Sequence, residues 1–262
     1  MPSVLTGAAL ANRELTYLGV SGDGDSASIG IGQFAHAMRR GVNMTYIVEN
    51  NGVYGLTKGQ FSATSDKGSK AKKGDVNRDA PIDLVGLALQ LGATYVARSF
   101  SGDKAQLVPL IMGALSHQGA AVIDVLSPCV QFNNHAGSTK SFDYVREHNE
   151  AVNKLDVIIE REEITAEYEP GSVIEIAQHD GSLLRLKKLE ADYDPSDRAA
   201  ALSYLMRHQV KGDIVTGLLY VDPDSHDLHE AHGTVAKPLN QLGEKELVPG
   251  SAVLDKINAG LR

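Results

Sequence analysis

Short runs of β-branched and apolar residues alternate with longer helical patterns over the first half of the chain. Consecutive residues are mainly apolar in runs such as Thr45 to Val48 and Ala121 to Val125, a pattern typical of strands that helices cover on both faces. Strands that alternate with helices indicate βαβ units, so the pattern predicts an α/β fold with a mostly parallel sheet flanked by helices. The expected strands are 16–22, 44–51, 94–100 and 120–128, and the expected helices are 28–41, 81–92 and 103–119.

The pattern changes after about Asp156. A small hairpin is expected around His179, Asp180 and Gly181, and a helix with a polar face is expected over 141–156. The sequence therefore predicts two parts. These are an α/β domain over residues 1–156 and a small C-terminal α+β extension over 157–262, which we expect to contact other subunits and partners.

Composition narrows the class of protein. The chain of 262 residues has a net charge of −8 without long runs of like charge, which argues against nucleic acid as a main partner. Its apolar runs fall well short of the ~20 residues that span a bilayer, and its first residues do not resemble a signal peptide, so we expect a cytoplasmic protein. The single cysteine, Cys129, excludes an internal disulfide and cannot alone hold a metal or a cluster.

Two acids, Asp23 and Asp25, lie in a glycine-rich turn directly after the first expected strand. Ligands of open parallel sheets bind at the carboxyl ends of strands, where this turn falls together with residues 49–55 and 127–134. One interpretation is a dinucleotide-binding fingerprint, Gly22-x-Gly24-x-x-Ala27 with Glu49 on the next strand. Two unit charges about 4 Å apart, however, repel by roughly 4 kcal/mol at an effective dielectric of ~20, so a bare phosphate should avoid this turn.

A divalent cation reverses this repulsion, because Mg²⁺ joins one or two carboxylates to phosphate oxygens. Asn50, Asn51 and Val53 follow the second strand and offer amide and carbonyl oxygens to the same ion. The two segments together therefore predict a clamp for a diphosphate and Mg²⁺. Either segment by itself could be an ordinary turn.

This arrangement resembles the thiamine diphosphate motif, GDG followed on the next strand by NN, of decarboxylases, transketolases and 2-oxo acid oxidoreductases. The resemblance implies that Asp23 and Asn51 ligate Mg²⁺ through their side chains and Val53 through its carbonyl. It also implies that Gly22, Gly24 and Asp25 line the diphosphate.

The segment YGLTKGQFSATS, residues 54–65, resembles the 2-oxo acid:ferredoxin oxidoreductases. Residues 127–134 and 138–156 are similar to their thiamine-binding β subunit, above all in the 2-oxoglutarate branch. The resemblance covers nearly the whole chain and implies reversible oxidative decarboxylation of a 2-oxo acid to an acyl-CoA, with electrons passed through a 4Fe-4S cluster to ferredoxin. Pyruvate or another 2-oxo acid as substrate, an NAD-binding dehydrogenase and a non-catalytic assembly subunit remain open alternatives.

The same resemblance places residues around the substrate. Leu56, Thr57 and Lys58 are the expected catalytic-pocket residues, and Lys58 could pair with the distal carboxylate of a 2-oxo diacid. Lys58 could equally be an exposed lysine of a loop. The further expected cofactor contacts are Tyr54, Gly55, Leu56, Thr57 and Gln60.

Cys129 matches the last of the four thiolates that hold the 4Fe-4S cluster in this family. The other three precede the GDG segment there, so we expect that a cysteine-bearing N-terminal segment is missing from this sequence. In the family a separate α subunit supplies the glutamate that activates the thiazolium. The chain is therefore expected to form an α–β heterodimer or a dimer of heterodimers, with ferredoxin, a 2-oxo acid and coenzyme A as partners.

Overall fold

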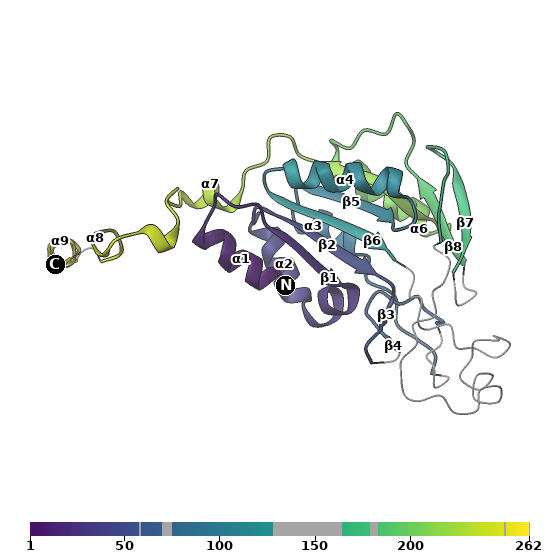
Figure 1. Ribbon diagram of the computed structural model, residues 1–262, viewed down its shortest axis with the longest axis horizontal. Helices are drawn as coiled ribbons and strands as arrows, with labels where there is room; N and C mark the ends of the chain where they lie inside the picture. The colour runs from purple at the N-terminus through teal and green to yellow at the C-terminus, as the bar shows by residue number, and fades with distance from the viewer. Residues whose placement is uncertain (58, 70–74, 128–163, 179–182, 249, 262) are drawn as a thin grey trace, which may run out of the picture.

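The computed structural model describes residues 1–57, 59–69, 75–127, 164–178, 183–248 and 250–261. A mixed seven-stranded sheet forms its body, with the strand order β1-β2-β6-β5-β9-β8-β7 (Figure 1). The first four strands in this order run parallel to one another, which confirms the predicted mostly parallel sheet. They are β1 (Leu18–Gly22), β2 (Met44–Asn50), β6 (Ala120–Leu126) and β5 (Tyr95–Phe100).

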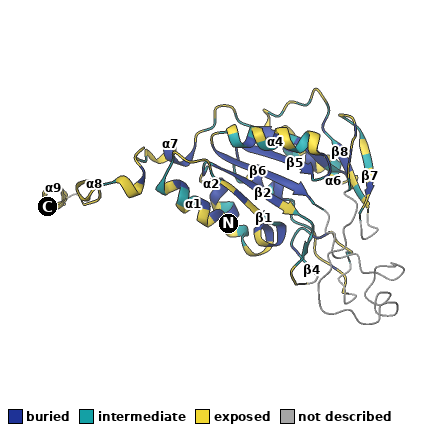
Figure 2. Ribbon diagram, in the orientation of Figure 1, coloured by how far each residue is buried: buried dark blue, intermediate teal, exposed yellow. Residues whose placement is uncertain are grey.

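Helices cover both faces of these strands. Residues of α1 (Pro2–Ala11), α2 (Ile31–Arg39) and α3 (Leu84–Gln90) pack into the core on one face. On the other face α4 (Lys104–Ser116) packs against β2, β5 and β6. Every residue of β5 and β6 is buried as a result, which agrees with their nearly continuous apolar sequences (Figure 2).

The strands after residue 156 continue the same sheet. The expected hairpin is present as β7 (Val173–Ala177) and β8 (Leu183–Lys188), which pair antiparallel, although residues 179–182 of its turn lie outside the described residues. Beyond it, β9 (Ile214–Val221) lies between β8 and β5 and pairs antiparallel with β5. The sequence pattern did not predict β9. The division at residue 156 stays a prediction.

The remaining helices follow the chain to its end. The side chain of Asp197 caps α6 (Arg198–Gln209) by accepting the backbone N–H groups of Ala199 and Ala200, and α6 packs beside β9. The last elements are α7 (Leu228–His232), the 3₁₀ turn η2 (Leu239–Gln241), α8 (Glu244–Leu247) and α9 (Ser251–Gly260).

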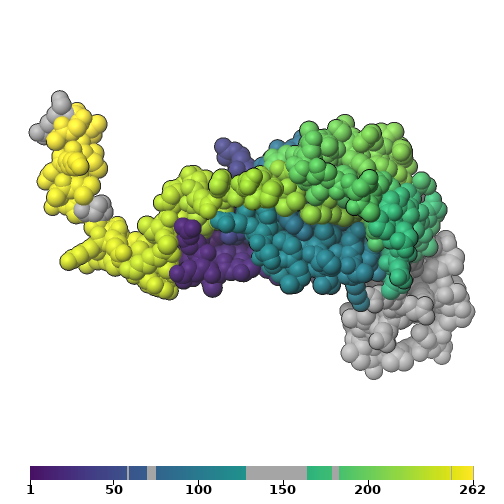
Figure 3. Space-filling model, turned by 90° about the horizontal axis from the view of Figure 1, so that it is seen from above, coloured from purple at the N-terminus to yellow at the C-terminus, as the bar shows by residue number. Residues whose placement is uncertain are grey.

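The described residues from 243 to 261 form a C-terminal arm that points away from the sheet (Figures 1 and 3). Each of them is exposed. Among the described residues, none of the helices combines the length and the apolar character needed to cross a membrane. The helix expected over 141–156 lies outside the described residues.

Candidate functional site

The glycine-rich turn lies at the carboxyl end of β1. Gly22 is in register with Glu49 of β2, so the residues that follow each strand meet at one edge of the sheet. The chain then enters η1 (Gly24–Ile29), a short π-helical turn. Asp23, between strand and turn, is only 1% exposed. Asp25, by contrast, is exposed.

Within the part of the chain that the structure describes, three hydrogen bonds hold the Asp23 carboxylate. Its Oδ1 accepts the backbone N–H of Asn51 at 3.3 Å, and its Oδ2 accepts the hydroxyl of Thr64 at 2.6 Å and that of Ser62. All three donors are uncharged. A carboxylate offers about four lone-pair directions, so this buried anion keeps acceptor capacity for a cation. Carboxylate and carbonyl oxygens are also the donor set that Mg²⁺ prefers, so the residues present fit that ion.

Asn51 joins the turn after β1 to the segment after β2 through its backbone, because its N–H donates to Asp23. The Asn51 side-chain Oδ1 accepts the backbone N–H of Val53 at 3.0 Å and thereby closes the turn between β2 and β3 (Val53–Tyr54). The structure thus places Asp23, Asn51 and Val53 in one hydrogen-bonded group. In this arrangement the Asn51 side chain contacts Val53 rather than Asp23.

Gly22 and Gly24 differ in what surrounds them. A Cβ on Gly24 would overlap the ring of Tyr54, whose hydroxyl donates to the Gly24 carbonyl at 3.0 Å. A Cβ on Gly22 would meet no atom within 4 Å, and the φ angle of Gly22 lies outside the left-handed region. Packing within the chain explains the glycine at 24, whereas the open space at 22 fits the close approach of a ligand to the backbone.

The remaining expected pocket residues belong to a small hairpin. Tyr54 of β3 pairs with Gln60 of β4 (Gln60–Phe61) across a turn that contains Gly55, Leu56 and Thr57. Leu56 is 98% exposed, and the Thr57 hydroxyl donates to the Tyr54 carbonyl at 3.4 Å. Gln60 is exposed as well. Lys58 and Cys129 lie outside the described residues.

A buried ion pair lies beside this group, and sequence reasoning missed it. Arg98 of β5 donates from Nε to Asp124 Oδ2 at 2.8 Å and from Nη2 to Asp83. Asp124 of β6 has no exposed surface, and its Oδ1 accepts the side-chain N–H of Asn50 at 3.0 Å. The signal was present in the sequence, because Arg98 and Asp124 are the charged residues within two mainly apolar strands, and charged residues are rarely buried unless paired.

The charges of this pair depend on each other. Burial by itself would lower the pKa of Arg98, but the carboxylates of Asp83 and Asp124 raise it above its ordinary value. Burial raises the pKa of Asp124 against the opposing effect of Arg98. Removing either partner would leave a charge buried without compensation, which costs about 3–5 kcal/mol in comparable pairs.

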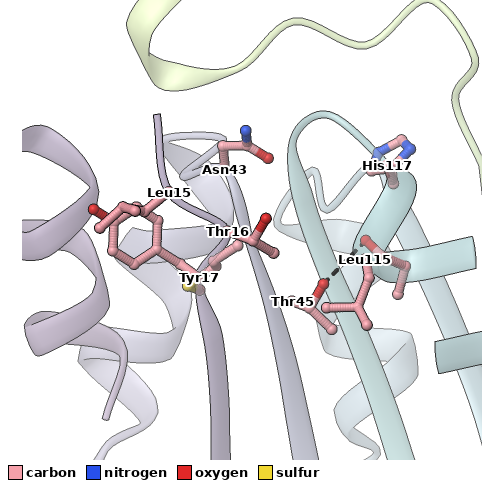
Figure 4. A pocket seen from close by; sticks show the side chains of 9 residues that line it. Leu15, Thr16, Tyr17, Asn43, Thr45, Leu115 and His117 are labelled. Carbon is pink, nitrogen blue, oxygen red and sulfur yellow. Dashed lines mark hydrogen bonds between the residues drawn. The ribbon is translucent and has the colours of Figure 1, made fainter. Parts of the chain in front are cut away.

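A separate shallow pocket lies at the opposite edge of the sheet. It is lined by residues before β1, by residues around the start of β2 and by the end of α4, and among them are Tyr17, Asn43, Thr45 and His117 (Figure 4). The Thr45 hydroxyl donates to the Ala114 carbonyl at 3.0 Å. None of the residues predicted to bind cofactor or substrate lines this pocket.

Comparisons with known proteins find similarity to thiamine pyrophosphate enzymes and to 2-oxo acid oxidoreductase subunits. Residues 1–125 match the family model described as thiamine pyrophosphate enzyme, C-terminal TPP binding domain. The chain is 41% identical over 146 residues to 2-oxoglutarate oxidoreductase subunit KorB of Mycobacterium tuberculosis, a match that covers 55% of this chain and 38% of that protein. It is 47% identical over 131 residues to the 2-oxoacid:ferredoxin oxidoreductase subunit beta of Saccharolobus solfataricus, covering 49% of this chain and 42% of that protein.

A solved structure extends the similarity over the fold. The 2-oxoglutarate:ferredoxin oxidoreductase from Magnetococcus marinus, with 2-oxoglutarate, coenzyme A and succinyl-CoA bound, is 28% identical with a TM-score of 0.64. The match covers 95% of this chain and 72% of that one. The two curated relatives above match over about two fifths of their own length. The predicted resemblance to β subunits of 2-oxo acid:ferredoxin oxidoreductases is confirmed.

Proposed function

We propose that this chain, a relative of the β subunits of 2-oxo acid:ferredoxin oxidoreductases, binds thiamine diphosphate with Mg²⁺ and serves such an enzyme in the oxidative decarboxylation of 2-oxoglutarate. One observation carries the proposal. Asp23 is a buried carboxylate whose hydrogen-bond donors among the described residues are all uncharged, and it lies beside Asn51 at the carboxyl edge of the parallel strands. The names of the relatives support the reaction class and the substrate.

The chain's own residues would hold the cofactor by its diphosphate. Asp23, Asn51 and the Val53 carbonyl would ligate Mg²⁺, and the open space at Gly22 would let the diphosphate approach the backbone. Tyr54 would keep the glycine-rich turn in place through the hydrogen bond from its hydroxyl to the Gly24 carbonyl. Thiamine diphosphate, once bound, supplies the electron sink that decarboxylation of a 2-oxo acid requires.

The hairpin between β3 and β4 would face the substrate. Leu56 and Thr57 at its turn leave an exposed surface, which a second subunit would cover to exclude water. Lys58 would pair with the distal carboxylate of 2-oxoglutarate, a charge-assisted contact that pyruvate cannot make. Replacing Lys58 by Met should therefore reduce the preference for 2-oxoglutarate over pyruvate, and unchanged discrimination would remove this role.

The partners follow from the resemblance to a β subunit. An α subunit would complete the site, and coenzyme A would accept the acyl group. Ferredoxin would accept the electrons through a 4Fe-4S cluster. The enzyme would act in the cytoplasm. Cys129 would be one thiolate of that cluster. Four protein thiolates hold such a cluster in the usual case, and the sequence contains one cysteine.

Purification with the candidate α subunit under anoxic conditions tests the proposal. The complex should reduce a low-potential dye in a reaction that requires both 2-oxoglutarate and coenzyme A. Calorimetry should show that thiamine diphosphate binds only when Mg²⁺ is present, and Asp23→Asn should abolish that binding. Binding of NAD without Mg²⁺ would instead identify a dehydrogenase, and no binding of thiamine diphosphate would identify a non-catalytic subunit.

A further inference from the structure

The segment after β4 carries two hydroxyl side chains onto the proposed cation ligand. The Thr64 hydroxyl lies 2.6 Å from Asp23 Oδ2, and Ser62 donates to the same oxygen. The Thr64 hydroxyl also lies 3.0 Å from the side-chain oxygen of Asn50. Thr64 therefore contacts both Asp23, which follows β1, and Asn50, the last residue of β2.

A hydroxyl has one hydrogen, so Thr64 can donate to only one of these two oxygens at a time. The shorter and charge-assisted bond to Asp23 Oδ2 is the stronger choice. Among the described residues, Asp23 Oδ1 accepts one backbone N–H, that of Asn51, and so keeps a lone pair that a cation can take. Thr64 then holds Oδ2 both with and without the cation, and Asn50 lies beside it as a second acceptor.

The Asn50 side-chain oxygen can act as an acceptor for the Thr64 hydroxyl only if the Asn50 amide is held in one orientation. Its side-chain N–H donates to Asp124 Oδ1 at 3.0 Å, which leaves its amide oxygen directed at Thr64. Asp124, which is fully buried, accepts from Arg98 through its other oxygen at 2.8 Å, and Arg98 also binds Asp83. A chain of polar contacts thus links the ion pair in the core to Asp23, with Thr64 in contact with both Asn50 and Asp23.

We propose that Arg98, Asp124 and Asn50 form a buried relay that positions Thr64, and through Thr64 the Asp23 carboxylate, for the cation that accompanies the cofactor. The inference rests on the proposed function, since it takes Asp23 to be the cation ligand. The relay residues act as positioning residues and do not ligate the ion. Residues that orient a metal ligand in this way typically change metal affinity by 10–100-fold when they are replaced.

The test uses the full chain in complex with its α subunit, with Mg²⁺ titrated by calorimetry at saturating thiamine diphosphate. Thr64→Val removes the hydroxyl at nearly constant volume and should weaken Mg²⁺ binding about tenfold, which is about 1.4 kcal/mol. Thr64→Ser keeps the hydroxyl and should restore binding to within about twofold of the wild type. Thr64→Val should leave the unfolding temperature of the cofactor-free complex nearly unchanged, because Thr64 is only partly buried.

A double-mutant cycle then tests the link to the core. Asp124→Asn should also weaken Mg²⁺ binding about tenfold, and adding it to Thr64→Val should cause little further loss because both act along one chain of contacts. Where Asp124→Asn does not fold, Arg98→Lys takes its place, since lysine keeps the charge but cannot make the forked contact. Asp213→Asn is the control, since Asp213 is another buried carboxylate and its ion pair with the exposed Arg185 shares no partner with the relay among the described residues.

Four outcomes overturn the inference. Unchanged or tighter Mg²⁺ binding in Thr64→Val excludes a positioning role for the hydroxyl. An additive loss of about a hundredfold in the double variant shows that Asp124 does not act through Thr64. Equal weakening of Mg²⁺ binding in Asp213→Asn shows that general loss of stability explains the effects. A wild-type complex that binds no thiamine diphosphate overturns the proposed function, whereas normal wild-type binding with unaffected variants overturns the relay alone.

Discussion

At the scale of single residues, the two glycines of the turn after β1 occupy their positions for different physical reasons. Gly24 lies against the Tyr54 ring, so the chain itself leaves no room for a side chain. Gly22 has free space around its Cβ position and an ordinary φ angle, so neither packing nor backbone conformation requires a glycine there. The family resemblance implied that both glycines line the diphosphate, but it could not separate these two roles.

Alanine at each position separates the two roles by experiment. Gly24→Ala should lower the free energy of unfolding by about 1–3 kcal/mol, because the new methyl group must displace the Tyr54 ring. Gly22→Ala should leave stability unchanged within about 0.5 kcal/mol but weaken binding of thiamine diphosphate. Urea unfolding and calorimetry on both variants measure these effects. Equal stability losses in the two variants would contradict the assignment.

Glu190 provides a pH-dependent prediction at the same scale. Burial alone would raise the pKa of Glu190, but hydrogen bonds from Lys187 and Tyr204 outweigh it and lower this pKa to about 2 from an ordinary value of 4.5. A depressed carboxyl pKa stabilises the folded state above the ordinary value, and this contribution disappears as the pH falls through the folded value.

Glu190→Gln should therefore be less stable than the wild type at neutral pH, and the difference should shrink between about pH 4.5 and pH 2. The effect should be small and should weaken further in salt, since the Glu190 side chain is 40% exposed. Urea unfolding of both proteins across this pH range measures it. A difference that stays constant down to pH 2 would contradict the role of the carboxylate.

At the scale of helices and strands, the local pattern identified most elements of the first 126 residues, because apolar runs and helical periodicity are visible in short windows. One strand that it missed, β9, has a comparable apolar run from Ile214 to Val221. Its antiparallel pairing with β5 joins residues more than a hundred positions apart, such as Arg98 and Gly217. No short window contains that information.

The fit of β9 into the sheet makes Gly217 a sensitive position. Its φ of +131° is rare for L residues, and a Cβ would lie 2.8 Å from Cδ1 of Leu189. Gly217→Ala should lower the free energy of unfolding by about 2–4 kcal/mol, from backbone strain and overpacking together.

Gly212→Ala is the matched control for Gly217→Ala. Gly212 also has a positive φ, +75°, but its Cβ would meet nothing within 4 Å, so only the backbone term of about 1–2 kcal/mol remains. Thermal or urea unfolding of both variants compares the two sites. A larger loss at Gly212 than at Gly217 would contradict the packing of β9 against Leu189.

At the scale of the whole molecule, a seven-stranded sheet carries the candidate site at one edge and the C-terminal arm points away from it (Figure 3). Among the described contacts of the arm, the ion pair between Lys237 and Glu246 joins it to the preceding chain at 2.9 Å. Both side chains are nearly half exposed, and such surface pairs contribute about 0–1 kcal/mol. The arm therefore adds little to the stability of the sheet.

Deleting residues 243–262 tests this independence. The shortened chain should unfold within about 2 °C of the full chain, because every described residue of the deleted segment is exposed. Differential scanning calorimetry of the two chains measures the change. The shortened chain should also bind thiamine diphosphate as tightly as the full chain. A large drop in the unfolding temperature would contradict the prediction and show that the arm packs against the body.

The sequence by itself determined the alternation of strands and helices up to Leu126 and the meeting of Asp23 with Asn51 at one edge. It could do so because both follow from local periodicity and from the parallel connection of neighbouring strands. Only the tertiary structure decided that Ser62 and Thr64 hold the Asp23 carboxylate, that Arg98 joins Asp83 to Asp124, and that β9 completes the sheet. These features depend on strand register and on contacts between distant parts of the chain, which are formed only when the whole sheet assembles.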